Sequence, residues 1–265
     1  MNRQPINMIG GGFQHTLSTN TFEPKYVEWV KGNHTAPISI YIDNSLKMIS
    51  SSKTKNYGWL CESKTINVEL YKWCIENIEH LKENFISVFT HDVELSKLSE
   101  IFVLTLCSGK SFLPYGKIHT KNKLVSMIAS NKVMCEEHKF RQQMINKFSS
   151  DCDHYGRGFN PINDKSDGLR DYCFSFAMEN ATYSNMFTEK ITDCFMMGTI
   201  PIYYGIPNIG DFFNTDGIIL LDNNFSVEDL SFNLYQSKMD VIKENYELSV
   251  NMPIAEDYIY ENFIK

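Results

Sequence analysis

The sequence predicts an α/β protein in which parallel sheets are covered by helices on both faces. The first observation is that short apolar runs alternate with stretches of helical spacing along the chain. The second is the length, because 265 residues suffice for two modest domains. The third is segment 108–122, which is rich in Gly, Pro, Lys and His and separates two such halves. We therefore expect one domain over residues 1–115 and another over residues 116–265.

The first half contains apolar runs of strand length that end in polar or turn residues. The expected strands are residues 6–9, 38–42, 57–61, 85–89 and 101–106, and residues 68–81 have helical spacing. Three glycines, Gly10–Gly12, follow the first strand and allow a tight turn there. They lack the third glycine position of a dinucleotide-binding fingerprint, so they do not by themselves indicate a cofactor.

The second half repeats the alternation of strands and helices. The expected strands are residues 124–129, 173–178, 199–204 and 217–221. Helical spacing covers residues 137–148 and 226–248, a further helix begins near residue 189, and the aromatic tail 258–263 is expected to be a helix packed back on the fold.

Composition narrows the classes of function and location. The net charge of −7 and the pI of about 5.5 argue against broad nucleic-acid binding. Seven cysteines with no C-x-x-C pair suit thiols in a reducing compartment better than a disulfide framework. Residues 1–12 lack the apolar segment of a signal peptide, and no run reaches the length of a membrane span. We expect a soluble cytoplasmic protein.

The most informative stretch is residues 172–205. A buried strand ends at Glu179 and Asn180, and Thr188 can cap a helix whose first turn holds Glu189 and Lys190. The N–H groups and dipole of a helix start favour an anion, and Lys190 adds a full positive charge. The sequence therefore predicts that a phosphate-bearing ligand binds where this helix begins, beyond the carboxyl end of a parallel strand.

The same stretch carries a resemblance to a known family. Met178-Glu179-Asn180, Thr188-Glu189-Lys190-Ile191 and the segment from Gly198 to Gly205 resemble the donor-binding signature of the family 10 glycosyltransferases. These are the α1,3/α1,4-fucosyltransferases, with patterns of the form F-E-N-S, T-E-K and G-x-x-P-[IV]-x-x-G. The resemblance implies a GT-B architecture, in which two Rossmann-like parallel-sheet domains face each other across a cleft. The N-terminal domain would hold the acceptor and the C-terminal domain the nucleotide sugar.

The resemblance also implies an activity and its partners. The expected reaction is inverting transfer of a sugar, most simply L-fucose from GDP-fucose, to a hydroxyl of a glycan acceptor. A glycolipid acceptor would bring the protein to a membrane surface without a transmembrane segment. Met186 stands where the family often has Tyr, which keeps open a different GDP- or UDP-sugar donor. A non-catalytic protein that binds a sugar nucleotide or carbohydrate is the third alternative.

The resemblance assigns donor-binding roles to six residues, which are Arg141, Glu179, Asn180, Tyr183, Glu189 and Lys190. It places Lys190 on the phosphates and Glu189 on the ribose hydroxyls. Arg141 would clamp the diphosphate, for which its planar fork is suited, while Lys139 and Lys132 remain alternatives. Asn180 would donate a hydrogen bond to the donor, and Tyr183 could supply the hydroxyl that Met186 lacks.

The acceptor hydroxyl needs a general base. Glu62, at the end of a strand, resembles the catalytic glutamate of the family in its position. The pair His91–Asp92 competes with it, because histidine is the commonest general base, and Asp43 is a third choice.

We expect no metal and no cofactor, because lysine, arginine and a helix dipole can neutralise the departing diphosphate. The segment Asp151-Cys152-Asp153-His154 contains a D-x-D spacing that could bind a divalent cation. So short a pattern occurs often by chance, and we favour an ordinary structural role for it.

Overall fold

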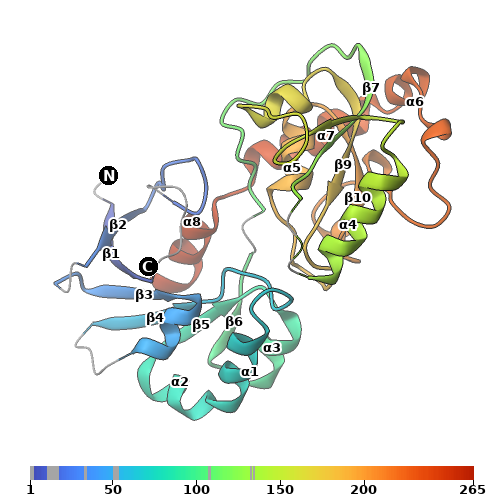
Figure 1. Cartoon of the computed structure of the whole chain (residues 1–265). Helices are drawn as coiled ribbons and strands as arrows, with labels where there is room; N and C mark the ends of the chain where they lie inside the picture. Colours follow the sequence, from blue (N-terminus) through green and yellow to red (C-terminus); the bar gives the residue numbers. More distant parts are fainter. Residues whose placement is uncertain are drawn as a thin grey trace. The chain divides into compact units, whose positions relative to one another are not determined.

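The computed structural model describes residues 3–10, 18–32, 35–49, 54–106, 109–131, 133 and 135–265. The chain forms two compact units, each with its own parallel sheet (Figure 1). The first unit comprises Met1–Ser108, Ser184–Met186 and Pro253–Lys265, and the second comprises Gly109–Tyr183 and Phe187–Met252. The chain thus enters the second unit at the start of the segment that the sequence marked as the link. The last 13 residues differ from the expected division, because they return to the first unit.

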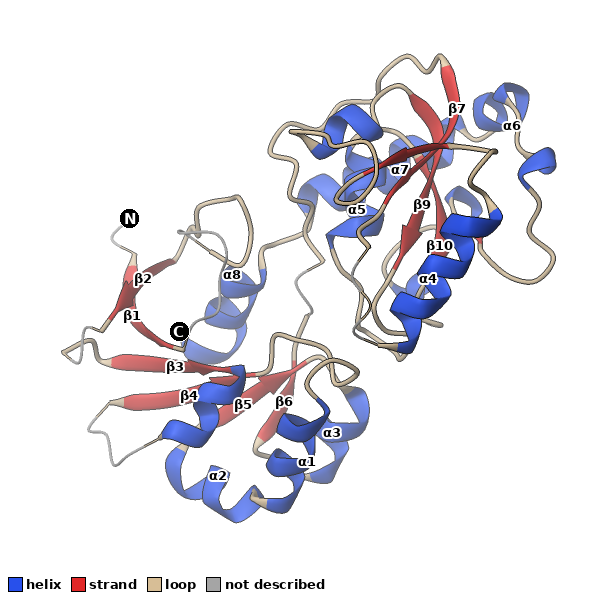
Figure 2. Ribbon diagram, viewed as in Figure 1, coloured by secondary structure: helices blue, strands red, loops and turns tan. Residues whose placement is uncertain are grey.

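All strands of the first unit run parallel, in the order β2-β1-β3-β4-β5-β6 (Figure 2). The strands are β1 (Gln4–Ile9), β2 (Val27–Lys31), β3 (Ile38–Ile42), β4 (Lys55–Trp59), β5 (Ser87–Thr90) and β6 (Phe102–Leu104). From β2 the chain crosses back over β1 to form β3. The order therefore reverses between β1 and β3, and this is the point where open α/β sheets bind ligands.

Helices cover both faces of this sheet, and they come from opposite ends of the chain. They are α1 (Val68–Glu76), α2 (Ile78–Asn84), α3 (Val93–Leu98) and α8 (Ala255–Ile259), with a π-helical turn at Tyr260–Ile264. The first three contribute to one apolar cluster, whereas Ala255 and Ile259 of α8 pack into another with strand residues such as Ile6 and Phe89. The helix expected over 68–81 is divided at Asn77, where the backbone leaves helical geometry.

Hydrogen bonds fix the C-terminal helix to the first unit. The Asp257 carboxylate accepts from the backbone N–H groups of Lys25 and Tyr26 at 2.9–3.0 Å. The buried Glu256 carboxylate accepts from the Thr19 hydroxyl at 2.8 Å. These contacts explain why the tail packs on the N-terminal sheet and not on the second unit.

The second unit has a five-stranded parallel sheet in the order β11-β10-β9-β7-β8. The strands are β7 (Lys123–Ile128), β8 (Asp153–Tyr155), β9 (Tyr172–Met178), β10 (Ile200–Tyr204) and β11 (Ile219–Leu220). Here the chain crosses from β8 over β7 to form β9, so the order reverses between β7 and β9. The prediction of parallel sheets covered by helices is confirmed for both units.

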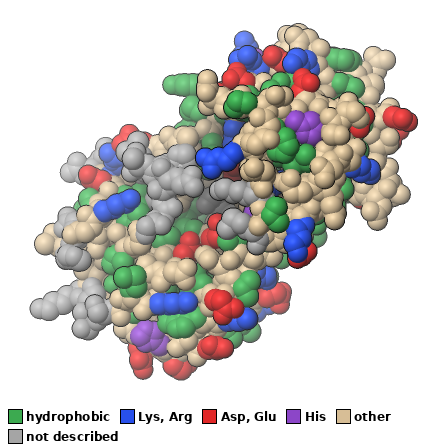
Figure 3. Space-filling view, in the orientation of Figure 1, with side chains coloured by type: hydrophobic (Ala, Val, Ile, Leu, Met, Phe, Trp, Pro, Cys, Tyr) green, Lys and Arg blue, Asp and Glu red, His purple; other side chains and the backbone are tan. Residues whose placement is uncertain are grey.

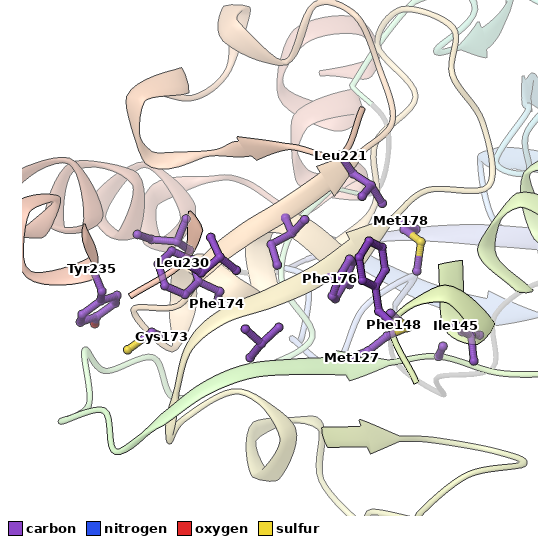
Figure 4. Packing of buried hydrophobic residues seen from close by; sticks show 14 of the residues in the cluster. Met127, Ile145, Phe148, Cys173, Phe174, Phe176, Met178, Leu221, Leu230 and Tyr235 are labelled. Carbon is purple, nitrogen blue, oxygen red and sulfur yellow. The ribbon is translucent and has the colours of Figure 1, made fainter. Parts of the chain in front are cut away.

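An apolar core on one face of this sheet joins strands and helices of the second unit. The helices of the unit are α4 (Glu136–Lys147), α5 (Glu189–Met196), α6 (Phe232–Ser237) and α7 (Met239–Asn251). Figure 4 shows Phe176 and Met178 of β9 near Phe148 and Ile145 from the α4 segment, whereas Phe174 lies nearer Leu230. Tyr235 of α6 closes the other end of this core and donates its hydroxyl to the Gly198 carbonyl at 2.8 Å. The expected helix 226–248 is therefore two helices and a preceding 3-10 turn.

The described surface, helices and cysteines bear on the partners and the location expected from the sequence. On the face shown in Figure 3, acidic and basic side chains are interspersed over the described residues. Within the described ranges, no helix combines the length and apolar character needed to cross a membrane. No disulfide joins the six cysteines that the structure describes.

Candidate functional site

A pocket of about 250 Å³ lies in the second unit at the reversal between β7 and β9. Charged residues from three elements line it, together with apolar and small residues from the strand ends. The charged lining residues are Arg141, Lys165, Glu189, Lys190 and Asp193, and the others are Ile128, Ala129, Ser130, Leu169, Ser175 and Met178. Three cations and the start of α5 thus converge on one cavity, as an anion site requires.

Glu179 fixes the start of α5 and its lysine. Its carboxylate accepts from the Thr188 N–H at 2.9 Å, from the Thr188 hydroxyl at 2.7 Å and from Lys190 Nζ at 3.1 Å. Thr188 occupies the N-cap position but makes no capping bond of its own, because its hydroxyl donates to Glu179. With a side chain only 1% exposed, Glu179 supports Lys190 from behind and does not line the pocket.

The glycines of the motif have separate physical roles. Gly198 has φ +65° and ends α5 in the left-handed region, as expected from the sequence. At Gly205 a side chain would meet the Tyr203 hydroxyl and the Glu179 side chain at 2.3 and 2.8 Å. Gly205 is therefore needed for the close packing that holds Glu179 at the end of β9.

Glu189 shares a cation with a second carboxylate that sequence reasoning missed. Lys165 Nζ donates to Glu189 Oε1 at 2.7 Å and to Asp193 Oδ2 at 2.9 Å. Burial raises the pKa of Glu189, but the nearby charges of Lys165 and Lys190 outweigh it and hold that pKa at about 2. Asp193 lies one helical turn after Glu189, so the i, i+4 spacing was a usable signal. Lys165 comes from a 3-10 turn whose position in space no sequence pattern indicated.

Arg141 of α4 is the second cation that was expected, and the structure places it in the pocket lining. Its guanidinium donates to Asn180 Oδ1 at 3.4 Å and to the Ser130 hydroxyl at 3.5 Å. Asn180 Oδ1 also lies 2.9 Å from His138 Nε2. Asn180 thus orients Arg141 and does not itself line the pocket.

The alternatives to Arg141 fare differently. Lys139 is largely exposed and pairs with Glu136 at 2.5 Å one turn away on the same helix. Lys132 lies outside the described residues, as do Gly11 and Gly12 of the glycine turn. Tyr183 is half-buried in the loop before α5 and is absent from the pocket lining, so the structure does not bring its hydroxyl to this cavity.

The first unit has its own pocket, of about 450 Å³, at the reversal between β1 and β3. Its lining includes Gly10 after β1, Asp43 after β3 and Glu62 after β4. The Glu62 carboxylate accepts from the Ser63 N–H at 2.9 Å. Asp43 Oδ1 accepts from the N–H groups of Cys61 and Glu62 at 2.9 and 3.2 Å. Two of the three carboxylate candidates for the base therefore share one cavity.

Burial raises the pKa of Asp43 to about 6, partly offset by the two backbone N–H groups and reinforced by the charge of Glu62. The folded chain therefore binds this proton more tightly than the unfolded chain, whose aspartate has a pKa near 3.8. The contribution of Asp43 to stability is most favourable below pH 4. It is lost as the pH rises from about 4 to about 6.

The native chain loses stability between pH 4 and pH 8 as Asp43 ionises, and Asp43→Asn does not. We therefore expect the free energy of unfolding of the variant, relative to that of the native chain, to be higher at pH 8 than at pH 4 by up to about 3 kcal/mol. The amide oxygen can still accept from the two N–H groups, so the native hydrogen bonds persist. Urea denaturation of both proteins at the two pH values measures the difference. If the difference in free energy of unfolding between the two proteins were the same at both pH values, this account would be contradicted.

His91 and Asp92 serve the fold of the first unit. His91 is 2% exposed, and burial lowers its pKa to about 4. Asp92 caps α3 by accepting from the Glu94 N–H at 2.9 Å, and it pairs with Lys64 at 2.9 Å. A buried neutral histidine and an occupied cap do not suit a base that must reach an acceptor.

The D-x-D segment has ordinary partners. Asp153 Oδ2 accepts from the Tyr172 hydroxyl at 2.5 Å and from Lys123 Nζ at 3.1 Å, whereas His154 Nε2 lies 3.2 Å from the Phe148 carbonyl. Over the described part of the chain, no group of three or more His, Cys, Asp or Glu side chains is arranged to hold a metal ion.

Comparison with solved structures assigns the fold to a class of protein. An α1,3-fucosyltransferase structure matches with a TM-score of 0.52 and 14% identity, covering 94% of this chain and 82% of that one. A structure titled as α1,3-fucosyltransferase with GDP matches with a TM-score of 0.54 and 14% identity, covering 97% and 86%. The fold is that of the GT-B glycosyltransferases.

Sequence comparison then gives the family. Residues 118–248 match the family model for the C-terminal domain of glycosyltransferase family 10 (fucosyltransferase). This region contains every lining residue of the cavity in the second unit. The match covers just under half of the chain, and it includes the motifs that resemble the donor-binding signature of family 10.

Two curated relatives are similar to the chain in the same way. The α-(1,3)-fucosyltransferase FucT of Helicobacter pylori is 29% identical over 109 residues, covering 40% of this chain and 22% of the relative. GDP-fucose protein O-fucosyltransferase 3 of Bos taurus is 24% identical over 188 residues, covering 59% and 39%. The chain thus spans well under half the length of these relatives.

Proposed function

We propose that this protein transfers a sugar from a nucleotide sugar, most directly L-fucose from GDP-fucose, to a hydroxyl of a glycan acceptor. The observation that carries the proposal is the cavity of the second unit. Arg141, Lys165 and Lys190 converge there on the start of α5, inside the family 10 domain. A nucleoside diphosphate is the anion that fits such a site at the switch point of a parallel sheet.

The arrangement can stabilise a leaving diphosphate without a metal. Two of the three donors of Lys190 Nζ engage Glu179 and Thr188 at 3.1 and 2.9 Å, so a phosphate oxygen can take the third. Arg141, oriented by Asn180 and Ser130, supplies bidentate contacts. These groups neutralise charge that develops as the glycosidic bond breaks, which is the largest contribution expected at such a site. We therefore propose that no cofactor is required.

We propose Glu62 as the base that removes the proton of the acceptor hydroxyl. The oxygen then attacks the anomeric carbon from the face opposite the diphosphate, so the configuration inverts. The pocket that holds Glu62 and Asp43 supplies the carboxylate for this step. We also propose a cytoplasmic enzyme that meets any membrane only through a glycolipid acceptor. The absence of disulfides among the described cysteines supports a reducing compartment.

We expect GDP to raise the melting temperature of the protein more than UDP does at equal concentration, because a ligand that binds only the folded state stabilises it. A thermal-shift series with GDP, UDP and GMP measures this. A shift with UDP alone would favour another donor sugar, for which Met186 is the motivating departure from the family pattern. If no nucleotide produced a shift, the proposed function would fail.

Transfer itself is tested with GDP-fucose and a panel of glycan acceptors, with the product configuration determined by NMR. A product with the anomeric configuration opposite to that of the donor supports inversion, and a retained configuration overturns it. Binding of GDP without transfer or donor hydrolysis would identify a non-catalytic binding protein.

A further inference from the structure

The 3-10 turn at Lys165–Gly168 presents a cation to the donor pocket in a fixed position. The Asp164 side chain accepts from the Ser166 N–H at 2.7 Å and caps the turn. The Ser126 hydroxyl of β7 donates to the Gly168 carbonyl at 2.6 Å and ties the turn to the sheet. The Lys165 side chain, 35% exposed, therefore extends from a backbone that is held at both ends.

Lys165 lies between two carboxylates of unequal freedom. Asp193, with a side chain 3% exposed, is anchored through Oδ1 by the Ser111 hydroxyl at 2.6 Å and the Phe112 N–H at 2.9 Å. Its other oxygen accepts from Lys165 at 2.9 Å, and Lys165 then donates to Glu189 at 2.7 Å. Glu189 is the more exposed carboxylate, at 17%. The chain of contacts thus runs from a rigid anchor to the residue that borders the cavity.

Without the lysine, Glu189 and Asp193 would be like charges one helical turn apart, an arrangement that is unfavourable. Glu189 would then turn away from Asp193 or take up a proton. With the lysine, Glu189 remains ionised and its Oε1 is held at one point beside the cavity. An ionised carboxylate only accepts hydrogen bonds, so it is matched to a ligand that presents a pair of hydroxyl donors.

We propose that Lys165 is a positioning residue that holds Glu189 for the ribose diol of the donor, an inference that rests on the proposed function. Asp193 is the anchor through which Lys165 acts. Lys165 contributes to selectivity for a ribonucleotide, whereas Lys190 and Arg141 contact the phosphates.

The test compares GDP with 2′,3′-dideoxy-GDP by calorimetry. The native protein is expected to bind GDP at least roughly tenfold more tightly than 2′,3′-dideoxy-GDP, because the analogue cannot donate hydrogen bonds from the ribose to the charged Glu189. In Lys165→Met the preference falls to within about twofold, as it does in the reference variant Glu189→Ala. Lys165→Arg retains most of the preference. The control Lys123→Met removes a half-exposed cation paired with Asp153 and leaves the ratio unchanged.

The outcomes separate this inference from the proposed function. If Lys165→Met weakens both nucleotides equally, Lys165 contacts a phosphate and the positioning role is overturned. The positioning role is also overturned if neither affinity changes, because the ratio of the two affinities then stays at its native value. If the native protein binds neither nucleotide, both the proposed function and the inference fail. Should Lys165→Met not fold because Asp193 is left buried without its cation, Lys165→Met/Asp193→Asn removes that charge. The repulsion on Glu189 is then also removed, so the preference for GDP is expected to fall less far than in Lys165→Met, but a ratio equal to the native one would still overturn the positioning role.

Discussion

Replacing Lys190 by methionine is expected to weaken GDP binding by roughly 10- to 100-fold, the value of one or two hydrogen bonds between charged groups. Lys190 is the cation at the start of α5, and its ammonium is held beside the cavity by Glu179 and Thr188. Methionine keeps the length of the side chain and removes only the charge and the donors. Calorimetric titration with GDP measures the loss.

This substitution also leaves the Glu179 carboxylate, 1% exposed, without its cation. Removing one partner of a buried pair costs about 3–5 kcal/mol of stability, so weaker binding could reflect a damaged fold. Lys190→Met/Glu179→Gln separates the two effects, because the neutral amide can still accept from Thr188. We expect the double variant to recover melting temperature but not GDP affinity.

Lys139→Met serves as the matched control, because Lys139 lies in the same unit and pairs with Glu136 in solvent. Its GDP affinity should equal that of the native protein. If Lys190→Met/Glu179→Gln bound GDP as tightly as this control, the phosphate site would have to lie elsewhere.

The strand-helix-strand unit that carries the donor motif was predictable because its local signals agree. Residues 173–178 are apolar except for Ser175, as expected for a strand buried on both faces, and the structure has β9 there. Gly198 ends α5 with a positive φ angle. Where propensity, patterning and turn residues all favour one structure, sequence reasoning places an element within a residue or two.

The elements that the sequence did not reveal depend on distant parts of the chain. The strands β2 and β8 are edge strands of five and three residues, and partial exposure removes the continuous apolar pattern. The helix α8 was expected to pack on the fold, but its sequence could not specify which sheet receives it. That choice depends on contacts such as Asp257 with Lys25, more than 200 residues apart.

The candidate site shows the same division between local and distant information. Glu189 and Lys190 were found because they stand together in a motif at a helix start. Lys165 and His138 were missed, because each comes from a separate loop or helix and meets the motif only in the folded chain. Conversely, Glu179 and Asn180 were expected to contact the donor, and the structure places them behind Lys190 and Arg141 as supports. A motif identifies residues that act together, but only geometry separates the residue that lines the cavity from the one that orients it.

Replacing Glu62 by glutamine is expected to lower turnover by about 10²- to 10⁴-fold, the usual contribution of a general base. GDP affinity should stay within about twofold of the native value, because none of the first-unit residues that the structure describes lines the cavity beside α5. Glutamine preserves the acceptor for the Ser63 N–H, so the loop after β4 keeps its conformation. Hydrolysis of GDP-fucose and transfer to glycan acceptors give the rates, and calorimetry gives the affinity.

Asp43→Asn decides between the two carboxylates of that pocket. If Glu62 is the base, the amide at position 43 still accepts from the Cys61 and Glu62 N–H groups, and turnover falls far less than in Glu62→Gln. Burial raises the pKa of Asp43 to about 6, which suits a base that works near neutrality. Asp43 therefore stays a candidate for the base beside Glu62. A loss in Asp43→Asn equal to that in Glu62→Gln, with GDP affinity intact in both, would mean that the two carboxylates act as one unit. A loss confined to Asp43→Asn would transfer the role of base from Glu62 to Asp43.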